Sequence, residues 1–226
     1  VADAYQKNVF DLMNHPLVGM LLECRAASHR RGIRLLFGLP KVSWMSILKF
    51  AARAGFEVVP YTDFSCLEMP LDASYAAGPF GMTNLDAFTG EHVALWQAFR
   101  TSEEIACAVD RDLEMLNFRN GPHLKVDCRD EAGALAGFAA IRRDGLVFDL
   151  VPARLDLIPS LLASLAAGLA DQDLTHLKIL HGPWMGDLGG LPFAKTDYKF
   201  GFVSDALDPA LAGQVHPSQW YLAGGG

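Results

Sequence analysis

The stretch from Gly32 to Val59 constrains the fold of this chain more than any other, because glycine and proline divide it into clear parts. Ile33 to Phe37 is a short apolar run, which is typical of a strand buried on both faces. Gly38-Leu39-Pro40 ends this strand, since glycine tolerates positive φ and proline has no amide hydrogen to donate to a β-ladder. An open loop is therefore expected at the carboxyl end of a buried strand.

A helix is predicted to follow that loop. From Ser43 onward, apolar residues recur every three or four positions, which gives one apolar helix face. Ser43 suits the N-cap position, because its hydroxyl can accept a hydrogen bond from a free amide. Gly55 is placed as a left-handed helix stop, and Phe56 to Val59 starts another strand. Loops that follow a strand's carboxyl end are where α/β sheets tend to bind ligands.

This order of elements resembles the C-terminal half of the GNAT acyl-CoA N-acyltransferase fold, in which a strand ending near a proline precedes a helix and then Gly-Phe. The resemblance covers roughly residues 1 to 70. It implies acetyl-CoA or another acyl-CoA as the acyl donor and a small-molecule amine as the acceptor. In that fold a splayed strand pair offers backbone amides to the pantetheine arm, so the resemblance assigns cofactor contacts to Leu39, Pro40 and Lys41.

The preceding segment fits the same resemblance only in part. Pro16 can occupy the first position of a helix that runs to about Gly32. In the GNAT fold the N-terminus of this helix receives the pyrophosphate of acyl-CoA, as free amides and the helix dipole favour an anion. Gln6, Lys7 and Asn8 then correspond to the phosphate loop, although both glycines of the family's Gln/Arg-x-x-Gly-x-Gly/Ala pattern are missing.

The second half of the chain repeats the pattern. It predicts a helix that is capped by Thr101 or Ser102, starts at Glu103 and runs to about Phe118. Three antiparallel strands with a hairpin at Asp144-Gly145 and an apolar helix from Leu157 to Leu169 are predicted next. A buried strand, an irregular segment and two closing strands follow. The predicted fold class is therefore mixed α/β, of α+β character: a GNAT-like, mostly antiparallel sheet flanked by helices.

Internal similarity predicts a tandem of one partial and one near-complete GNAT-like unit. Leu36 to Pro40 aligns with Leu180 to Pro183, and Gly55 to Val58 aligns with Gly201 to Val203. We expect residues 1–72 to form the C-terminal half of one unit and residues 101–226 a second, divergent unit. Residues 73–100, with scattered glycines, are expected to form a linker.

An N-acyltransferase must hold a thioester near an amine, deprotonate the ammonium and protonate the leaving thiolate. Ser43, Tyr61 and His181 are the catalytic candidates. Ser43 can contact the cofactor, with the N-cap as its structural alternative, and Tyr61 can line the cleft or simply occupy a surface turn. His181 follows a buried strand, where it suits a general base or a plain strand-end histidine.

Composition narrows the remaining functions. A net charge of -7 argues against nucleic-acid binding. The four cysteines form no CxxC pair, which predicts no metal site and a reduced, cytoplasmic protein. No apolar run has the length of a membrane span, and no signal peptide is evident.

The sequence leaves several readings open. The first is an acyl-CoA-dependent N-acetyltransferase that acts on an amine of a small molecule or sugar, and tandem units of this kind also resemble FemAB-type transferases. The second is a catalytically degenerate GNAT-like module that binds a ligand or a partner. Lys41 and Ala51 favour it, because they stand where the family often has Asn and Tyr. A homodimer formed through the helix at Leu157 to Leu169 is the third.

Overall fold

The computed structural model describes residues 16–38, 45–59, 65–71, 78–105, 107–108, 111–197, 202–211 and 220–221. The chain forms two compact units. Unit 1 contains residues 1–62 and 198–217, and unit 2 contains residues 63–197 and 218–226.

In the residues that the structure describes, unit 1 has a three-stranded sheet and two longer helices. Its elements are α2 (Pro16–Arg30), β1 (Leu35–Gly38), α3 (Met45–Arg53), β2 (Glu57–Val59), β11 (Phe202–Ala206) and the short η4 (Pro209–Leu211). The strand order is β1-β11-β2, and β11 is antiparallel to both neighbours. Gly55 has φ +86°, as expected for the residue that stops α3 before β2 begins. The core of unit 1 joins α2 to α3 through Val18, Phe50, Ala51, Ala54 and Phe56.

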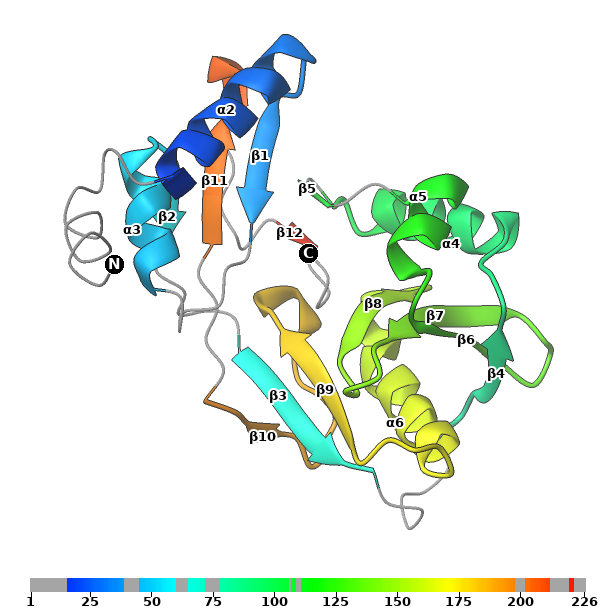
Figure 1. Cartoon of the computed structure of the whole chain (residues 1–226). Helices are drawn as coiled ribbons and strands as arrows, with labels where there is room; N and C mark the ends of the chain where they lie inside the picture. Colours follow the sequence, from blue (N-terminus) through cyan, green and yellow to red (C-terminus); the bar gives the residue numbers. More distant parts are fainter. Residues whose placement is uncertain are drawn as a thin grey trace. The chain divides into compact units, whose positions relative to one another are not determined.

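Unit 2 is built on a four-stranded antiparallel sheet of order β4-β6-β7-β8. Its elements are β4 (Gly81–Leu85), α4 (Gly90–Ser102), α5 (Leu113–Asn120), β6 (Leu124–Arg129), β7 (Leu135–Ile141), β8 (Val147–Pro152), η2 (Leu155–Leu157) and α6 (Ile158–Leu169). Figure 1 shows α4 and α6 on opposite faces of this sheet. Successive residues of β7 pack on opposite faces of the sheet. Ala139 and Ile141 pack with α6, whereas Phe138 and Ala140 pack with α4.

A second, three-stranded sheet completes unit 2, in the order β10-β3-β9. Its strands are β3 (Ser65–Pro70), β9 (His176–His181) and β10 (Ala194–Lys195), with η3 (Pro183–Met185) after β9. Both neighbours are antiparallel to β3. A parallel pair of short strands, β5 (Cys107–Ala108) and β12 (Trp220–Tyr221), lies beside them in unit 2.

The two three-stranded sheets share one topology. In unit 1, β1, a helix and β2 follow one another along the chain, and β11 lies between the two strands. In unit 2, β9, η3 and β10 follow one another, and β3 lies between them. β3, which follows β2 in the sequence, thus pairs with strands of unit 2. β11, which follows β10, pairs with strands of unit 1.

Two predictions about the middle of the chain were wrong. Residues 73–100 are not a simple linker, since they include β4 and most of α4. Thr101 does not begin a helix but lies near the end of α4, and Glu104 adopts a left-handed φ of +50° that stops it. The next helix begins instead at Leu113, after Asp112 accepts a hydrogen bond from the Met115 amide at 2.7 Å.

The closing strand also has a different partner from the one expected. It was predicted as part of the second unit, residues 101–226, but β11 pairs with β1 and β2 of unit 1. The alignment of Gly55 to Val58 with Gly201 to Val203 therefore matches β2, an edge strand, to β11, the central strand of the same sheet. The alignment of Leu36 to Pro40 with Leu180 to Pro183 matches β1 to β9, which hold equivalent places in their sheets.

Candidate functional site

Of the predicted site residues, His181 is the one that lies within the described part of the chain. Gln6, Lys7, Asn8, Leu39, Pro40, Lys41, Ser43 and Tyr61 lie outside the described residues. The arrangement of side chains that can be followed in detail is therefore that of unit 2, around the carboxyl ends of β8 and β9.

β8 and β9 run parallel and meet at a single isolated bridge between Leu146 and Lys178. The Lys178 amide donates to the Gly145 carbonyl at 2.9 Å. Gly145 makes this approach possible, because a Cβ at that position would lie 1.9 Å from the His176 carbonyl oxygen. Beyond the bridge the two strands belong to different sheets. Unit 2 thus contains a parallel strand pair that diverges toward its carboxyl ends, where α/β folds bind ligands.

Where β8 diverges from β9, side chains form hydrogen bonds with backbone groups of β8. The Leu150 amide donates to the Asp149 carboxylate at 3.1 Å, and the Leu150 carbonyl accepts from the Tyr221 hydroxyl. The Tyr221 ring lies 4.2 Å from the Trp184 ring, centroid to centroid. Complete burial raises the pKa of the Tyr221 hydroxyl well above its ordinary value, so it stays protonated and able to donate. A ligand that used the Leu150 backbone would have to displace these groups.

A buried ion pair holds the same region together. The Arg111 guanidinium donates to both carboxylate oxygens of Asp149 at 2.8–3.2 Å, and both side chains are almost fully buried. The Arg111 Cζ lies 4.3 Å from the centroid of the Trp96 ring and 5.6 Å from that of Tyr221. Such a cation is held by charge and by two aromatic faces at once.

Two carboxylates lie at the turn after β8: Asp156 within the turn, and Glu103 from the end of α4. The Leu155 amide donates to the Glu103 carboxylate at 3.2 Å. Asp156 pairs with Arg154 at 2.9–3.0 Å on the surface. An anionic pyrophosphate would meet two carboxylates here, and the amide at Leu155 is already satisfied. This turn does not suit a diphosphate.

A pocket of about 260 Å³ lies between this turn and η3. Its lining is Leu155, Asp156, Pro159, Trp184, Met185, Gly186 and Asp187. Next to it, half-buried His181 places its Nε2 2.9 Å from the Gly186 carbonyl oxygen. Since the carbonyl can only accept, the neutral ring carries its proton on Nε2 and leaves Nδ1 as an acceptor. His181 thus bonds the pocket's loop through Nε2.

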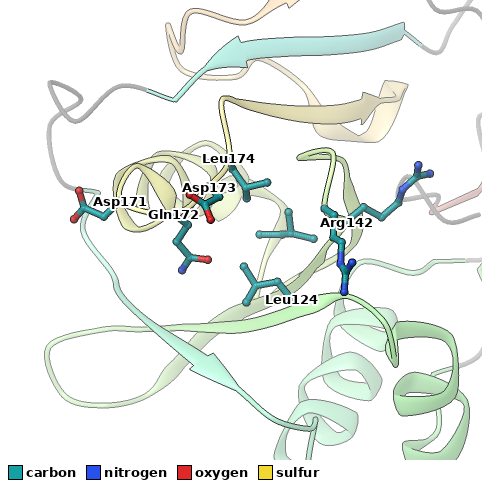
Figure 2. Close-up of a pocket in the computed structure, with 8 residues that line it drawn as sticks. Leu124, Arg142, Asp171, Gln172, Asp173 and Leu174 are labelled. Carbon is teal, nitrogen blue, oxygen red and sulfur yellow. The ribbon is translucent and has the colours of Figure 1, made fainter.

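A second hollow of about 400 Å³ lies at the other end of β9 (Figure 2). Leu124, Ile141 and Leu174 supply its apolar residues, and Asp171 and Arg142 lie on opposite sides of it. Arg142 also pairs with Asp144 at 3.0 Å. This hollow is open, carries charges of both signs, and lies away from the diverging strands.

Among the described residues, no group of three or more His, Cys, Asp or Glu side chains is arranged to hold a metal ion. In the same part of the chain, none of the helices combines the length and the apolar character that crossing a bilayer requires.

The mixed α/β fold, with antiparallel sheets, flanking helices and one diverging parallel pair, is the fold expected of GNAT-like proteins. Comparison with solved structures agrees. A conserved protein of unknown function from Enterococcus faecalis, described as a probable N-acyltransferase, has a TM-score of 0.52 at 12% identity, over 83% of this chain and 49% of that one. A Drosophila protein has a TM-score of 0.50 at 12% identity, over 76% of this chain and 61% of that one.

A GCN5-related N-acetyltransferase from Sphaerobacter thermophilus has a TM-score of 0.46 at 14% identity, over 77% of this chain and 60% of that one. This chain therefore spans about half to three-fifths of the length of the solved structures that it matches. No family model and no curated protein matches the sequence. At 12% identity, the likeness to the first two structures establishes the fold.

Sequence reasoning missed the cluster of Arg111, Asp149, Trp184 and Tyr221. The residues come from four separate segments, and their types form no spaced motif. One available signal was Asp149, a single charge within the apolar run from Val147 to Val151, because buried charges are normally paired.

Proposed function

We propose that this protein is an acyl-CoA-dependent N-acyltransferase, which transfers an acetyl group to an amine of a small molecule or sugar. The observation that carries the proposal is the sheet of unit 1, in which β1, α3 and β2 follow one another along the chain and β11 lies between the two strands, within a GNAT-like fold. One structure of the same fold is described as a probable N-acyltransferase. Such a fold holds donor and acceptor in place, which alone supplies much of the rate.

The donor site in this proposal belongs to unit 1. Gln6, Lys7 and Asn8 would receive the pyrophosphate, and Leu39, Pro40 and Lys41 would contact the pantetheine arm. α2 begins at Pro16, as the sequence predicted, and not close behind Gln6, Lys7 and Asn8; this helix start favours the second candidate function described below. The turn after β8 in unit 2 contains Asp156 and is bonded to Glu103 at the end of α4, so it is a poor alternative for an anion.

The catalytic role of each residue is proposed from the chemistry of its side chain. Ser43 would hydrogen-bond the donor in unit 1, and Tyr61 would line the same cleft. His181 of unit 2 has a free Nδ1 acceptor and would serve as a general base for that unit's ligand. A tandem arrangement of two GNAT-like units is part of the proposal, supported by the shared topology of the two three-stranded sheets. Cytoplasmic location and a homodimer remain predictions from the sequence.

The second candidate function is a catalytically degenerate ligand-binding module. Two observations favour it for unit 2: the Leu150 backbone groups are bonded to side chains, and the Leu155 amide is bonded to Glu103. In a conventional acyltransferase those positions serve the donor. Under this alternative, unit 2 keeps the fold but binds a different ligand.

Calorimetric titration with acetyl-CoA and with CoA separates the two candidates. For the N-acyltransferase we expect saturable binding that is weakened in Lys41→Ala. Lys49→Ala is the matched control, because Lys49 is an exposed lysine of α3 and its loss removes the same charge. Absence of heat at millimolar acetyl-CoA, or equal weakening by both variants, would contradict the proposed donor site.

A further inference from the structure

The first turn of α4 contains a buried histidine that faces the sheet of unit 2. His92 is 2% exposed, and its ring lies edge-on to two phenylalanine rings, with centroid distances of 5.2 Å to both Phe88 and Phe138. Figure 1 shows α4 beside the sheet that contains β6 and β7. The ring is shielded from water, so its nitrogens depend on protein groups for hydrogen bonds.

The Nδ1 atom of His92 completes the start of α4. Thr89 is the N-cap residue, and its backbone amide donates to Nδ1 at 3.0 Å. The Thr89 hydroxyl oxygen also lies 3.0 Å from the same nitrogen. A ring nitrogen that accepts a hydrogen bond carries no proton, so the ring is neutral and its proton is on Nε2. The neutral form of His92 is thus the form that caps the helix.

The Nε2 atom faces a second buried group without bonding to it. It lies 4.0 Å from Oδ2 of Asp127, a residue of β6 that is also 2% exposed. This separation is too long for a hydrogen bond. Among the described residues, neither Nε2 of His92 nor Oδ1 of Asp127 has a hydrogen-bond partner. A buried donor therefore lies beside a buried carboxylate that can still accept, and a short movement would join them.

The charged groups around His92 come from α4 and β6, because β4 and β7 contain no ionisable residue. On β6, Asp127 accepts from Nε of Arg129 at 2.9 Å. The same guanidinium bonds Glu91 of α4 at 2.7–3.0 Å. Lys125, the remaining charged residue of β6, donates instead to backbone carbonyl oxygens that follow α5.

These charges act on the ring in opposite directions. Asp127 and Glu91 favour a charged ring, whereas Arg129 opposes it. Burial has the largest effect and lowers the pKa of His92 below the ordinary value of about 6.5. The ring is therefore neutral at neutral pH and takes up a proton only in acid.

Protonation changes the hydrogen bonds at both ends of the ring. A proton that binds the Nδ1 lone pair removes the acceptor for the Thr89 amide, and the two N–H groups then oppose each other. The Thr89 hydroxyl can turn to accept from the new Nδ1–H, but the amide is left without its bond. At the other end Nε2–H belongs to a cation, and the Asp127 carboxylate attracts it into a charge-assisted hydrogen bond of about 2.7–2.9 Å.

We propose that His92 is a pH-sensitive switch that exchanges its partner on α4 for a partner on β6. In the neutral state it bonds the Thr89 amide and closes the first turn of α4. In the protonated state it bonds Asp127 and releases that amide, so the first turn opens while the sheet stays folded. The switch belongs to unit 2 and does not depend on acyl transfer.

NMR spectroscopy of the full chain tests both states. The ring nitrogens of His92, assigned by their absence in His92→Gln, are expected to show the neutral Nε2–H form at about pH 7.5 and the cation at about pH 4.5. Over this range the protection of the Thr89 amide against hydrogen exchange should fall about ten-fold, as expected for the loss of one hydrogen bond. Ala139 of β7 should stay far better protected than Thr89 at both pH values, which distinguishes local opening from unfolding.

Two histidine variants assign the response. His92→Gln provides an amide oxygen that can accept from Thr89 but cannot titrate, so it should remove the additional loss of Thr89 protection in acid. His123→Gln is the matched control, because His123 is half-buried in the same unit and burial lowers its pKa too. The His123 ring packs on Phe148, and its replacement should leave the response of Thr89 in place.

Asp127→Asn tests the second partner. Loss of this carboxylate removes an attraction for the charged ring, so the midpoint of the His92 titration should move to lower pH by about half a unit or more. Glu131→Gln removes one negative charge from the exposed turn after β6 and should leave the midpoint unchanged.

The unsubstituted chain alone can overturn the proposal, whether or not a variant folds. A His92 ring that stays neutral down to the pH of unfolding would do so, and so would a ring that titrates while Thr89 protection stays constant. An unchanged response in His92→Gln, or equal midpoints in Asp127→Asn and Glu131→Gln, would also contradict it.

Discussion

The hydroxyl of Tyr221 donates a hydrogen bond to the main-chain carbonyl of Leu150, 71 positions away in the sequence. This bond joins β12 to β8 just beyond the point where β8 and β9 separate. It satisfies a buried carbonyl of β8, the edge strand of its sheet, and it places an aromatic ring against Trp184. Tyr221 is thus part of what keeps the diverging strands apart and closed to water.

Tyr221→Phe tests the energetic weight of this bond. The substitution keeps the ring but leaves the Leu150 carbonyl unsatisfied, which is expected to lower the free energy of unfolding by about 1–3 kcal/mol. Urea denaturation provides the measurement. Thr101→Ala is the control, since that exposed hydroxyl donates to the Gln97 carbonyl at 2.9 Å and water can replace it. Equal losses in both variants would show that the Tyr221 hydroxyl has no special role.

Arg111→Met tests the buried ion pair. Asp149 would keep its charge inside the protein without its bidentate partner, so we expect a loss of about 3–5 kcal/mol in the free energy of unfolding. Arg142→Met removes a guanidinium from the half-exposed pair with Asp144 and should cost less than about 1 kcal/mol. If Arg111→Met were as mild as this control, the pair would not be the organising contact described above.

Gly145 and Gly133 offer a matched comparison, because both have φ +82°. A Cβ on Gly133 meets nothing within 4 Å, whereas one on Gly145 meets the His176 carbonyl. Gly133→Ala is expected to cost about 1–2 kcal/mol for its left-handed backbone. Gly145→Ala should cost about 1–3 kcal/mol more, from the clash at the β8–β9 junction. Equal costs in chemical denaturation would contradict the close approach of the two strands.

His92 is expected to make stability depend on pH. Its ring is buried, and Nδ1 accepts a hydrogen bond from the Thr89 amide at 3.0 Å at the start of α4. The neutral ring then has its proton on Nε2, which lies 4.0 Å from the Asp127 carboxylate. Burial lowers the pKa of His92, and this outweighs the attraction of Asp127 and Glu91 for a charged ring.

The direction of the pH effect follows from proton binding. Below the ordinary histidine pKa of about 6.5 the unfolded chain binds a proton that the folded His92 does not, so stability is lost as the pH falls through that value toward the lower folded pKa. His123, whose pKa is also lowered by burial, adds in the same direction. Urea midpoints at pH 8 and pH 5.5 measure the change. His92→Gln should reduce it, and an unchanged difference would exclude His92 as its source.

Local sequence signals identified most of the helices, strands and turns. They failed where tertiary packing determines the role of a residue. The hairpin at Asp144-Gly145, the stop at Gly55 and the helix beginning at Pro16 have strong local causes, and all three are confirmed. Glycines between Gly78 and Gly90 were read as a linker. One of them, Gly78, is a point of close packing, because a Cβ there would lie 2.2 Å from the Ser164 hydroxyl. A glycine needed for close approach looks the same in sequence as one needed for flexibility.

Strand partners and the site in unit 2 were beyond sequence reasoning for a different reason. Nothing local to Phe202–Ala206 distinguishes a strand that pairs in unit 1 from one that pairs in unit 2. Likewise, Arg111 and Tyr221 come together only through the tertiary fold. The predicted residues near Lys41 rest on a pattern of glycine and proline, and they remain predictions.

Hydrogen–deuterium exchange with and without acetyl-CoA tests the central claim most directly, because it reports on both units in one experiment. The account predicts protection of backbone amides at residues 5–10 and 38–44 of unit 1, and unchanged exchange at residues 152–158 of unit 2, where Glu103 and Asp156 disfavour a diphosphate. Protection centred on residues 152–158, or no protection anywhere at saturating acetyl-CoA, would contradict it.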